Sequence, residues 1–184
     1  MIIALVGFMG TGKSSVGTRL ATRLALDFID LDQLIEEQEE RNIPAIFAEE
    51  GEGYFRQLES ELLQGLLAGQ REMVLATGGG VVLSEVNRRI LQNKTFPVRL
   101  TATPAEIRAR IDGKGRPLLE SADPVGRILS LLKEREPYYR EFTHRVDTVG
   151  KNIEEVVEEI VNLIKRNGVD QFAGDQDKDQ GAGT

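Results

Sequence analysis

Short apolar runs alternate with longer amphipathic stretches along this chain. The apolar runs predict five strands, at residues 2–6, 28–30, 73–76, 96–100 and 145–149. After the first run, Val16, Leu20 and Leu24 recur every four positions, which is the period of a helix with one buried face. Further helices are predicted at 31–40, 43–67 and 84–93, and from Thr103, Asp123 and Asn152 onwards. Strands that alternate with helices are typical of an α/β fold whose parallel sheet is covered on both faces.

The helix ends have capping signals of their own. Thr103 is followed by Pro104 and Glu106, the order expected of a capping box with proline in the first helical position. Asn152 stands three residues before Glu155 in the same relation. Gly168 is expected to stop the last helix. The stripe of this helix that we predict to be buried consists of Ile153, Val156, Val157, Ile160 and Ile164.

A glycine-rich loop follows the first apolar run. Residues 7–14 read GFMGTGKS and fit the phosphate-binding pattern G-x-x-x-x-G-K-[ST] between a strand and a helix. Glycines let the backbone curl around phosphates, the lysine can reach the β- and γ-phosphates of ATP, and the serine hydroxyl can bind Mg²⁺. The predicted fold is therefore a P-loop NTPase three-layer α/β sandwich. The predicted nucleotide-binding residues in this loop are Gly10, Thr11, Gly12, Lys13, Ser14 and Ser15.

Composition narrows the class further. The chain has 184 residues, no cysteine, one histidine and a net charge of −7, which disfavours thiolate chemistry, multi-histidine zinc sites and non-specific nucleic-acid binding. We expect His144 at the surface or a strand edge. The chain contains no run of 18 apolar residues, and no charged region precedes the first strand, so we expect neither a membrane span nor a signal peptide. A single kinase domain at 1–167, a disordered acidic tail at 168–184 and a cytoplasmic monomer are the resulting predictions.

Two carboxylates stand two residues apart after the second strand. Asp30 and Asp32 would project to the same side of an extended segment and lie at the carboxyl edge of the sheet, where ligands of parallel sheets bind. One could then hold Mg²⁺ while the other accepts a proton from a hydroxyl nucleophile. The alternative is that both aspartates only cap the next helix.

Further along, Arg56 and Glu59 occur three residues apart on one helix face, so the carboxylate can hold the guanidinium in place for a bidentate ligand. An exposed ion pair is the alternative. Gly78, Gly79 and Gly80 follow the third strand directly, which suits the close approach of a ligand to the backbone, although a plain loop has the same composition.

Two later segments add basic residues. Residues 112–122 are glycine-rich and include Arg116, a composition that suits a mobile lid able to bring an arginine over the phosphates. A solvated loop is the alternative. Arg135 comes shortly before Pro137, which is expected to interrupt its helix.

The motifs GFMGTGKSSVG, FIDLD, GEGYFRQLE, TGGG, RPLL and REPYY, in this order, resemble shikimate kinase over about residues 1–165. The resemblance implies ATP-dependent, Mg²⁺-assisted phosphorylation of the 3-hydroxyl of shikimate, with Asp32 at the hydroxyls and Lys13, Arg116 and Mg²⁺ at the transferred phosphoryl group. It implies that Ser14 and Asp30 serve the metal and that Arg110 lies against adenine. The implied shikimate-binding residues are Asp32, Arg56, Glu59, Gly78, Gly79, Gly80 and Arg135. One departure is Lys151-Asn152, where family members often have arginine and proline near the adenine.

Two other interpretations compete with this one. Another small-molecule kinase, such as a gluconate kinase relative, would share the P-loop and an aspartate after the second strand, but would not need two arginines for a ring carboxylate. A nucleotide-dependent regulator without turnover should lack Asp32, Arg56 or Arg135, and all three are present.

Overall fold

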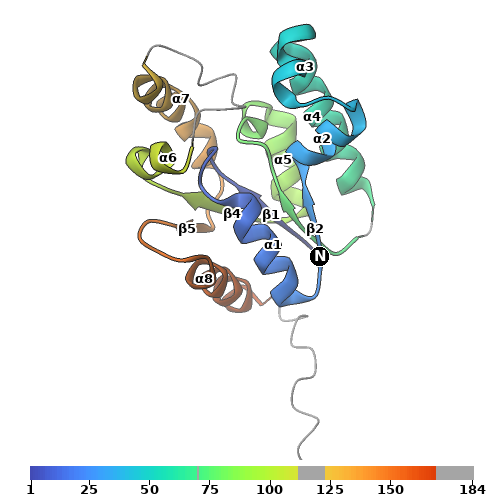
Figure 1. The fold of residues 1–184 in the computed structure, drawn as a ribbon. Helices are drawn as coiled ribbons and strands as arrows, with labels where there is room; N and C mark the ends of the chain where they lie inside the picture. Colours follow the sequence, from blue (N-terminus) through green and yellow to red (C-terminus); the bar gives the residue numbers. More distant parts are fainter. Residues whose placement is uncertain (70, 112–122, 169–184) are drawn as a thin grey trace, which may run out of the picture.

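The computed structural model describes residues 1–69, 71–111 and 123–168. Its centre is a five-stranded parallel sheet in the order β2-β3-β1-β4-β5, which confirms the predicted fold class (Figure 1). The predicted lid at 112–122 and the tail from residue 169 onwards lie outside the described residues. The strands are β1 (Ile2–Val6), β2 (Asp27–Asp30), β3 (Met73–Ala76), β4 (Phe96–Thr101) and β5 (Arg145–Asp147).

Helices cover both faces of this sheet (Figure 1). One face is covered by α1 (Lys13–Leu24) and α8 (Ile153–Arg166), and the apolar residues of the remaining helices gather on the other face. No helix in the described ranges is long and apolar enough to cross a membrane. The remaining elements are α2 (Leu31–Glu39), α3 (Ile43–Glu49), α4 (Gly51–Ala68), the 3₁₀ helix η1 (Val81–Leu83), α5 (Glu85–Lys94), α6 (Pro104–Arg110) and α7 (Pro124–Tyr139).

The central strand shows why this arrangement forms. All five residues of β1 are buried, as expected for a parallel strand with helices on both sides. Ile3 and Leu5 pack with α1 and α8, whereas Ala4 and Val6 pack with the helices of the opposite face. The chain leaves β1 at the carboxyl edge of the sheet, between β3 and β4, and this is where the glycine-rich loop begins.

Two predicted helix boundaries are wrong for identifiable reasons. The single helix predicted at 43–67 is two helices, because Gly51 has φ +83° and starts α4 in a new direction after α3. Pro137 does not interrupt its helix, since α7 continues through it and ends two residues later at Tyr139. Proline removes only its own N–H bond to the carbonyl four residues earlier, and the helical bonds resume after it, as the Arg140 N–H donates to the Glu136 carbonyl at 3.1 Å.

The predicted stripe of α8 is also wrong at one position. Val156, Val157, Ile160 and Ile164 are buried, but Ile153 is 44% exposed. Ile153 is the first residue of the helix, where the chain has not yet come over the sheet, and Val161 is buried in the stripe as well. His144 is half-buried beside the edge strand β5 and stacks on Phe96, as its predicted strand-edge position implies.

Candidate active site

The glycine-rich loop joins β1 to α1 in the conformation that its glycines permit. Gly10 has φ +78° and Gly12 has φ +92°, values that residues with side chains rarely adopt. Gly12 is the N-cap of α1, so no side chain occupies the acceptor position at the start of this helix. The first backbone N–H groups of α1 therefore remain available to an anion, which the helix dipole also favours.

The lysine of this loop is held against its backbone. The Lys13 amine donates hydrogen bonds to the carbonyl oxygens of Gly7 (2.8 Å) and Phe8 (3.0 Å) and is largely buried. The Thr11 hydroxyl donates to the same Phe8 carbonyl at 2.8 Å. These contacts place a positive charge inside the loop, where phosphates of a nucleotide would bind.

Ser14 and Asp30 meet at the start of α1. The Ser14 hydroxyl donates to Asp30 Oδ2 at 2.5 Å, while Asp30 Oδ1 accepts from the backbone N–H of Asp32 and caps α2. A hydroxyl beside a carboxylate is a ligand pair of the kind that Mg²⁺ prefers. The described residues contain no group of three or more acidic or histidine side chains able to hold a metal by themselves, so further ligands would have to come from phosphate oxygens and water.

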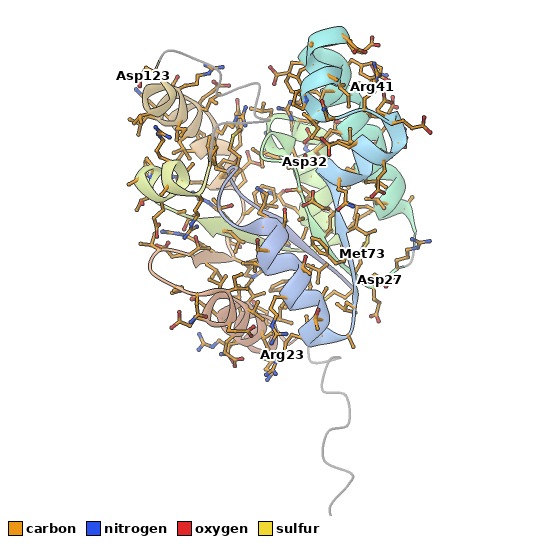
Figure 2. The ribbon with its side chains drawn as sticks, viewed as in Figure 1. Arg23, Asp27, Asp32, Arg41, Met73 and Asp123 are labelled. Atoms are coloured by element: carbon orange, nitrogen blue, oxygen red, sulfur yellow. The ribbon has the colours of Figure 1, made fainter. Side chains whose placement is uncertain are left out.

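The position of Asp32 differs from the expectation. It lies in the first turn of α2 and not in an extended segment, so Asp30 and Asp32 do not project to one side of a strand. Both nevertheless stay at the carboxyl edge of the sheet. Figure 2 shows Asp32 there, whereas Asp27 and Met73, which pair across β2 and β3, mark the opposite edge.

Gly78 lets two carboxylates approach its backbone. A Cβ at this position would lie 2.7 Å from Asp32 Oδ1 and closer still to Glu59 Oε1, so any side chain here would displace them. Glu59 is 1% exposed, and its Oε1 has no hydrogen-bond partner among the described residues. Burial raises the pKa of Glu59, and the neighbouring Arg56 guanidinium opposes that rise.

Arg56 is held by two carboxylates of its own helix. Its Nη1 donates to Glu59 Oε2 at 2.8 Å, and its Nε and Nη2 donate to Glu52 Oε1 at 3.2 and 3.1 Å. Burial lowers the pKa of Arg56, but the charges of Glu59 and Glu52 outweigh this effect and raise it overall. Its guanidinium lies against Gly80, where a Cβ would collide with it. The predicted Arg56–Glu59 pair is therefore largely buried at the glycine loop and is not the exposed pair of the alternative.

Arg135 reaches the same loop from α7. It is 2% exposed, its Nη1 donates to the Gly79 carbonyl at 3.2 Å, and its Nε has no hydrogen-bond partner in the described part of the chain. The guanidinium carbon also lies 5.9 Å from the centre of the Phe8 ring, so Arg135 borders the P-loop as well. A buried cation with donors to spare is suited to an anionic ligand.

A cavity of about 570 Å³ opens beside the P-loop. Thr11, Gly12 and Ser15 line it from one side, and residues of α6 and the β5–α8 connection line it from the other. Arg110 is positioned here by hydrogen bonds to the Thr148 hydroxyl (2.9 Å) and carbonyl (3.2 Å). Lys151 and Asn152, where the sequence departs from the family pattern, are in the same wall.

The sequence patterns do not indicate several residues of this cavity, and two of these bear on the site. Ile153 and Thr148 both line it, Ile153 as an exposed apolar side chain and Thr148 as the anchor of Arg110. The helical period marked Ile153 as a core residue, and only its place as the first residue after the Asn152 cap distinguishes it. Arg116, the predicted lid arginine, lies outside the described residues.

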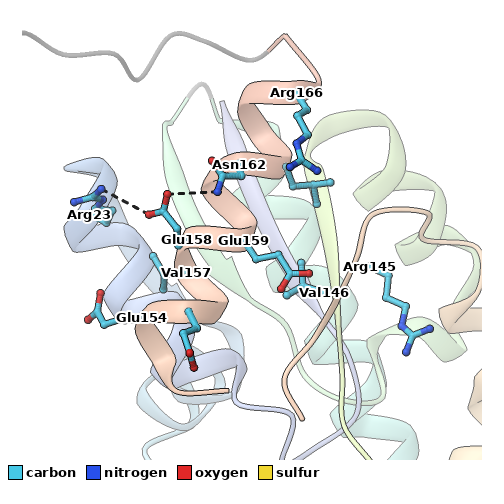
Figure 3. A pocket seen from close by; sticks show the side chains of 11 residues that line it. Arg23, Arg145, Val146, Glu154, Val157, Glu158, Glu159, Asn162 and Arg166 are labelled. Carbon is cyan, nitrogen blue, oxygen red and sulfur yellow. Dashed lines mark hydrogen bonds and ion pairs between the residues drawn. The ribbon is translucent and has the colours of Figure 1, made fainter. Parts of the chain in front are cut away.

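A larger hollow of about 760 Å³ runs along α8 and β5 (Figure 3). Its lining mixes arginines, among them Arg23 and Arg145, with glutamates of α8, and Arg23 pairs with Glu158 there. It includes neither the glycine-rich loop nor the two buried arginines at Gly78–Gly80. We therefore assign the active site to the carboxyl edge of the sheet.

The fold and this site define a P-loop kinase for a small molecule. The sheet is that of the nucleoside-monophosphate-kinase-like P-loop folds, the loop after β1 is built for phosphates, and an arginine-rich second site adjoins it. Comparison with known proteins specifies the family. The family model for shikimate kinase matches residues 9–165, and the chain belongs to this family.

Individual relatives agree. The shikimate kinase of Deinococcus radiodurans is 45% identical over 162 residues, covering 88% of this chain and 82% of the relative. That of Pelotomaculum thermopropionicum is 43% identical over 166 residues, covering 90% and 96%. The solved structure of the shikimate kinase from Acinetobacter baumannii in complex with shikimate has a TM-score of 0.86 and 37% identity, covering 90% of this chain and 93% of that one. These findings favour the shikimate kinase interpretation over the gluconate-kinase-like one.

Proposed function

We propose that this chain transfers the γ-phosphoryl group of ATP to the 3-hydroxyl of shikimate, giving 3-phosphoshikimate and ADP, as its family membership implies. The observation that supports this most is the convergence of Arg56 and Arg135 on the Gly78–Gly80 loop. Arg135 is buried with an Nε that has no partner among the described residues, and Arg56 lies beside it at the same loop, so the pair suits an acceptor that is itself an anion, and shikimate has a carboxylate.

The acceptor would bind between these groups. Arg56 and Arg135 would hold the ring carboxylate, since a guanidinium fork matches a carboxylate in geometry and charge. Glu59 keeps Arg56 in place through the 2.8 Å hydrogen bond. Asp32, whose Oδ1 lies beside Gly78 as Glu59 Oε1 does, would accept a hydrogen bond from a ring hydroxyl, and the backbone of Gly78, Gly79 and Gly80 would line the pocket.

The donor would occupy the P-loop and the cavity beside it. The N–H groups of residues 10–15 and the Lys13 amine would bind the phosphates, and the adenine would lie between Arg110 and the exposed Ile153. When bound, Mg²⁺ would neutralise phosphate charge, and Ser14 and Asp30 are the protein groups that would hold it. Arg116 stays a predicted contribution from residues 112–122.

The transfer itself needs positioning more than covalent catalysis. The acceptor oxygen attacks the γ-phosphorus in line as the bond to the leaving ADP oxygen breaks. Asp32 holds the acceptor hydroxyl and is the group that we assign to receive its proton. Lys13 stabilises the charge on the transferred phosphoryl group, which is why its place inside the loop matters.

A coupled ADP-release assay tests the proposal. Run in parallel with shikimate, gluconate and nucleoside monophosphates, it should show turnover with shikimate and little with the others. Replacing the substrate carboxylate by an amide should weaken wild type strongly, but an Arg56→Ala, Arg135→Ala double variant little. Each charge-assisted hydrogen bond is worth about 1.5–3 kcal/mol, so Arg56→Ala alone should raise the shikimate KM about tenfold or more. Equal sensitivity to the amide in both proteins would contradict the assignment of the two arginines.

The predictions of a monomer and of a cytoplasmic location stay predictions. Sedimentation of the full chain at several concentrations would test the first, and localisation of a tagged chain in cells would test the second.

A further inference from the structure

One backbone carbonyl, that of Gly79, accepts hydrogen bonds from two side chains of α7. Arg135 Nη1 donates to it at 3.2 Å and the Tyr139 hydroxyl at 2.5 Å. The two residues are four apart and therefore lie on the same face of the helix, one turn from each other. Tyr139 is buried, and its hydroxyl hydrogen is taken up by the Gly79 carbonyl, so we place it behind the pocket and not in it.

Gly79 links the two halves of the site. A Cβ on it would lie 3.0 Å from the backbone nitrogen of Met9, so the glycine packs against the P-loop itself. Its neighbours Gly78 and Gly80 make room for the side chains that face the acceptor, Glu59 and Arg56 among them. Whatever fixes the Gly79 carbonyl therefore fixes the distance between the phosphate-binding loop and the acceptor groups.

The Tyr139 ring also contacts an arginine of β4. The Arg99 guanidinium carbon lies 5.8 Å from the ring centre, within the range of a cation–π interaction. Arg99 Nη2 donates to both carboxylate oxygens of Glu136, at 2.9 and 2.7 Å, and so ties β4 to α7. Burial raises the pKa of the Tyr139 hydroxyl, which keeps it protonated and able to donate.

We infer that Tyr139 is a positioning residue for acceptor recognition, which rests on the proposed function. Its hydroxyl fixes the Gly79 carbonyl, and this carbonyl in turn holds the Arg135 guanidinium at the angle that directs its remaining N–H groups toward the substrate carboxylate. Arg135 bonds the Gly79 carbonyl at 3.2 Å and also makes a hydrogen bond with the Tyr139 hydroxyl, so loss of this hydroxyl loosens the guanidinium both directly and through its acceptor. Tyr139 thus acts through Arg135 and not on the reacting atoms.

Tyr139→Phe tests this, because it removes the hydroxyl and keeps the ring. Tyr138→Phe is the matched control: Tyr138 precedes it on α7 and stacks with Arg88, at 4.6 Å from the ring centre, away from Gly79. We expect Tyr139→Phe to raise the shikimate KM by roughly three- to tenfold, the effect of a single neutral hydrogen bond, with the ATP KM unchanged. Tyr138→Phe should change neither constant.

The discriminating readout is the ratio of KM values for the amide analogue and for shikimate. A misaligned Arg135 should lower this ratio in Tyr139→Phe, whereas a merely structural loss would lower Tm and leave the ratio at its wild-type value. An unchanged ratio would overturn the inference, even if both KM values rose by the same factor. Arg99→Lys removes the guanidinium that contacts the Tyr139 ring, and it should also lower the ratio. Failure of the wild type to phosphorylate shikimate would refute the proposed function, and this outcome is distinct from the others.

Discussion

Gly80→Ala is expected to displace the Arg56 guanidinium and to spare the nucleotide site. A Cβ at Gly80 would lie closer than 3.0 Å to the guanidinium carbon and to both terminal nitrogens of Arg56. The backbone does not resist the substitution, because Gly80 has φ −102°. Ordinary contact begins at 3.4 Å, so the guanidinium must retreat by about 1 Å, a displacement large enough to disrupt binding geometry.

The size of the effect follows from the hydrogen bonds that Arg56 makes. Its 2.8 Å bond to Glu59 would be lost after such a retreat, and so would the alignment with a substrate carboxylate. Hydrogen bonds to charged groups contribute about 1.5–3 kcal/mol, which corresponds to roughly ten- to 150-fold in affinity. We therefore expect the shikimate KM of Gly80→Ala to rise at least about tenfold, and the ATP KM to stay within about twofold of wild type.

The stability of this variant should depend on pH. Burial raises the pKa of Glu59, and loss of the Arg56 contact would raise it further. A carboxyl whose pKa is raised by folding destabilises the protein as pH rises past the unfolded value of 4.5, and not below it. The Tm difference between Gly80→Ala and wild type should accordingly be small at acidic pH and grow toward neutral pH.

Gly65→Ala is the control for both measurements. Gly65 lies on the same helix as Arg56, and a Cβ there meets nothing within 4 Å, so the substitution should stabilise α4 by about 0.5–1 kcal/mol and leave both KM values unchanged. Steady-state ADP release and thermal unfolding measure the two effects. A folded Gly80→Ala enzyme with the wild-type shikimate KM would show that the loop moves in place of Arg56, and the reasoning would fail.

Three further results are expected. Lys13→Met should lower kcat by a factor of about a thousand, with the fold intact by circular dichroism, because the Lys13 amine supplies the positive charge that stabilises the transferred phosphoryl group. A variant with wild-type turnover would exclude this role. Arg110→Ala should raise the KM for ATP several-fold in the same assay and leave the shikimate KM alone, whereas the reverse would place it in the acceptor pocket. Burial raises the pKa of Glu136, but hydrogen bonds from Arg99 and Arg140 lower it overall, so its contribution to stability is present above pH 4.5 and lost as pH falls. Glu136→Gln should therefore flatten the acid side of a Tm–pH profile, and an unchanged acid slope would contradict this.

Much of the fold could be predicted from sequence because local signals agree with the tertiary structure. Caps at Ser84, Thr103 and Asn152 form as expected, and each apolar run contains a strand, although β5 ends at Asp147, two residues before its predicted end. The errors arise where chain direction is decided by a single residue. Gly51 breaks a continuous helical pattern, and Pro137 costs α7 one hydrogen bond without ending it.

The sequence indicates which side chains gather at the candidate site, but not how they are arranged there; their roles stay predictions. The pattern of Arg56 and Glu59 indicates a pair on one helix, yet nothing in it shows that Gly80 must be a glycine to admit the guanidinium. Tyr139 belongs to the REPYY motif and Thr148 to none, but no sequence pattern indicates the role of either, since each acts by supporting a residue that is remote in sequence. Such support depends on packing between elements, which periodicity does not specify.

The order of strands has a consequence for how acceptor choice can change. The helices α2, α3 and α4 form one excursion between β2 and β3, which are hydrogen-bonded neighbours in the sheet. Parallel neighbours require a crossover of some kind, but the sheet does not specify its length or content. The nucleotide groups belong to other stretches, the P-loop, α6 and the β5–α8 connection. Asp32, Arg56 and Glu59 all lie on this excursion, and Gly78–Gly80 come shortly after β3, the strand at which it ends. We therefore expect a chimera that exchanges this stretch through Gly80, with Arg135 replaced to match, to change its acceptor and keep its donor.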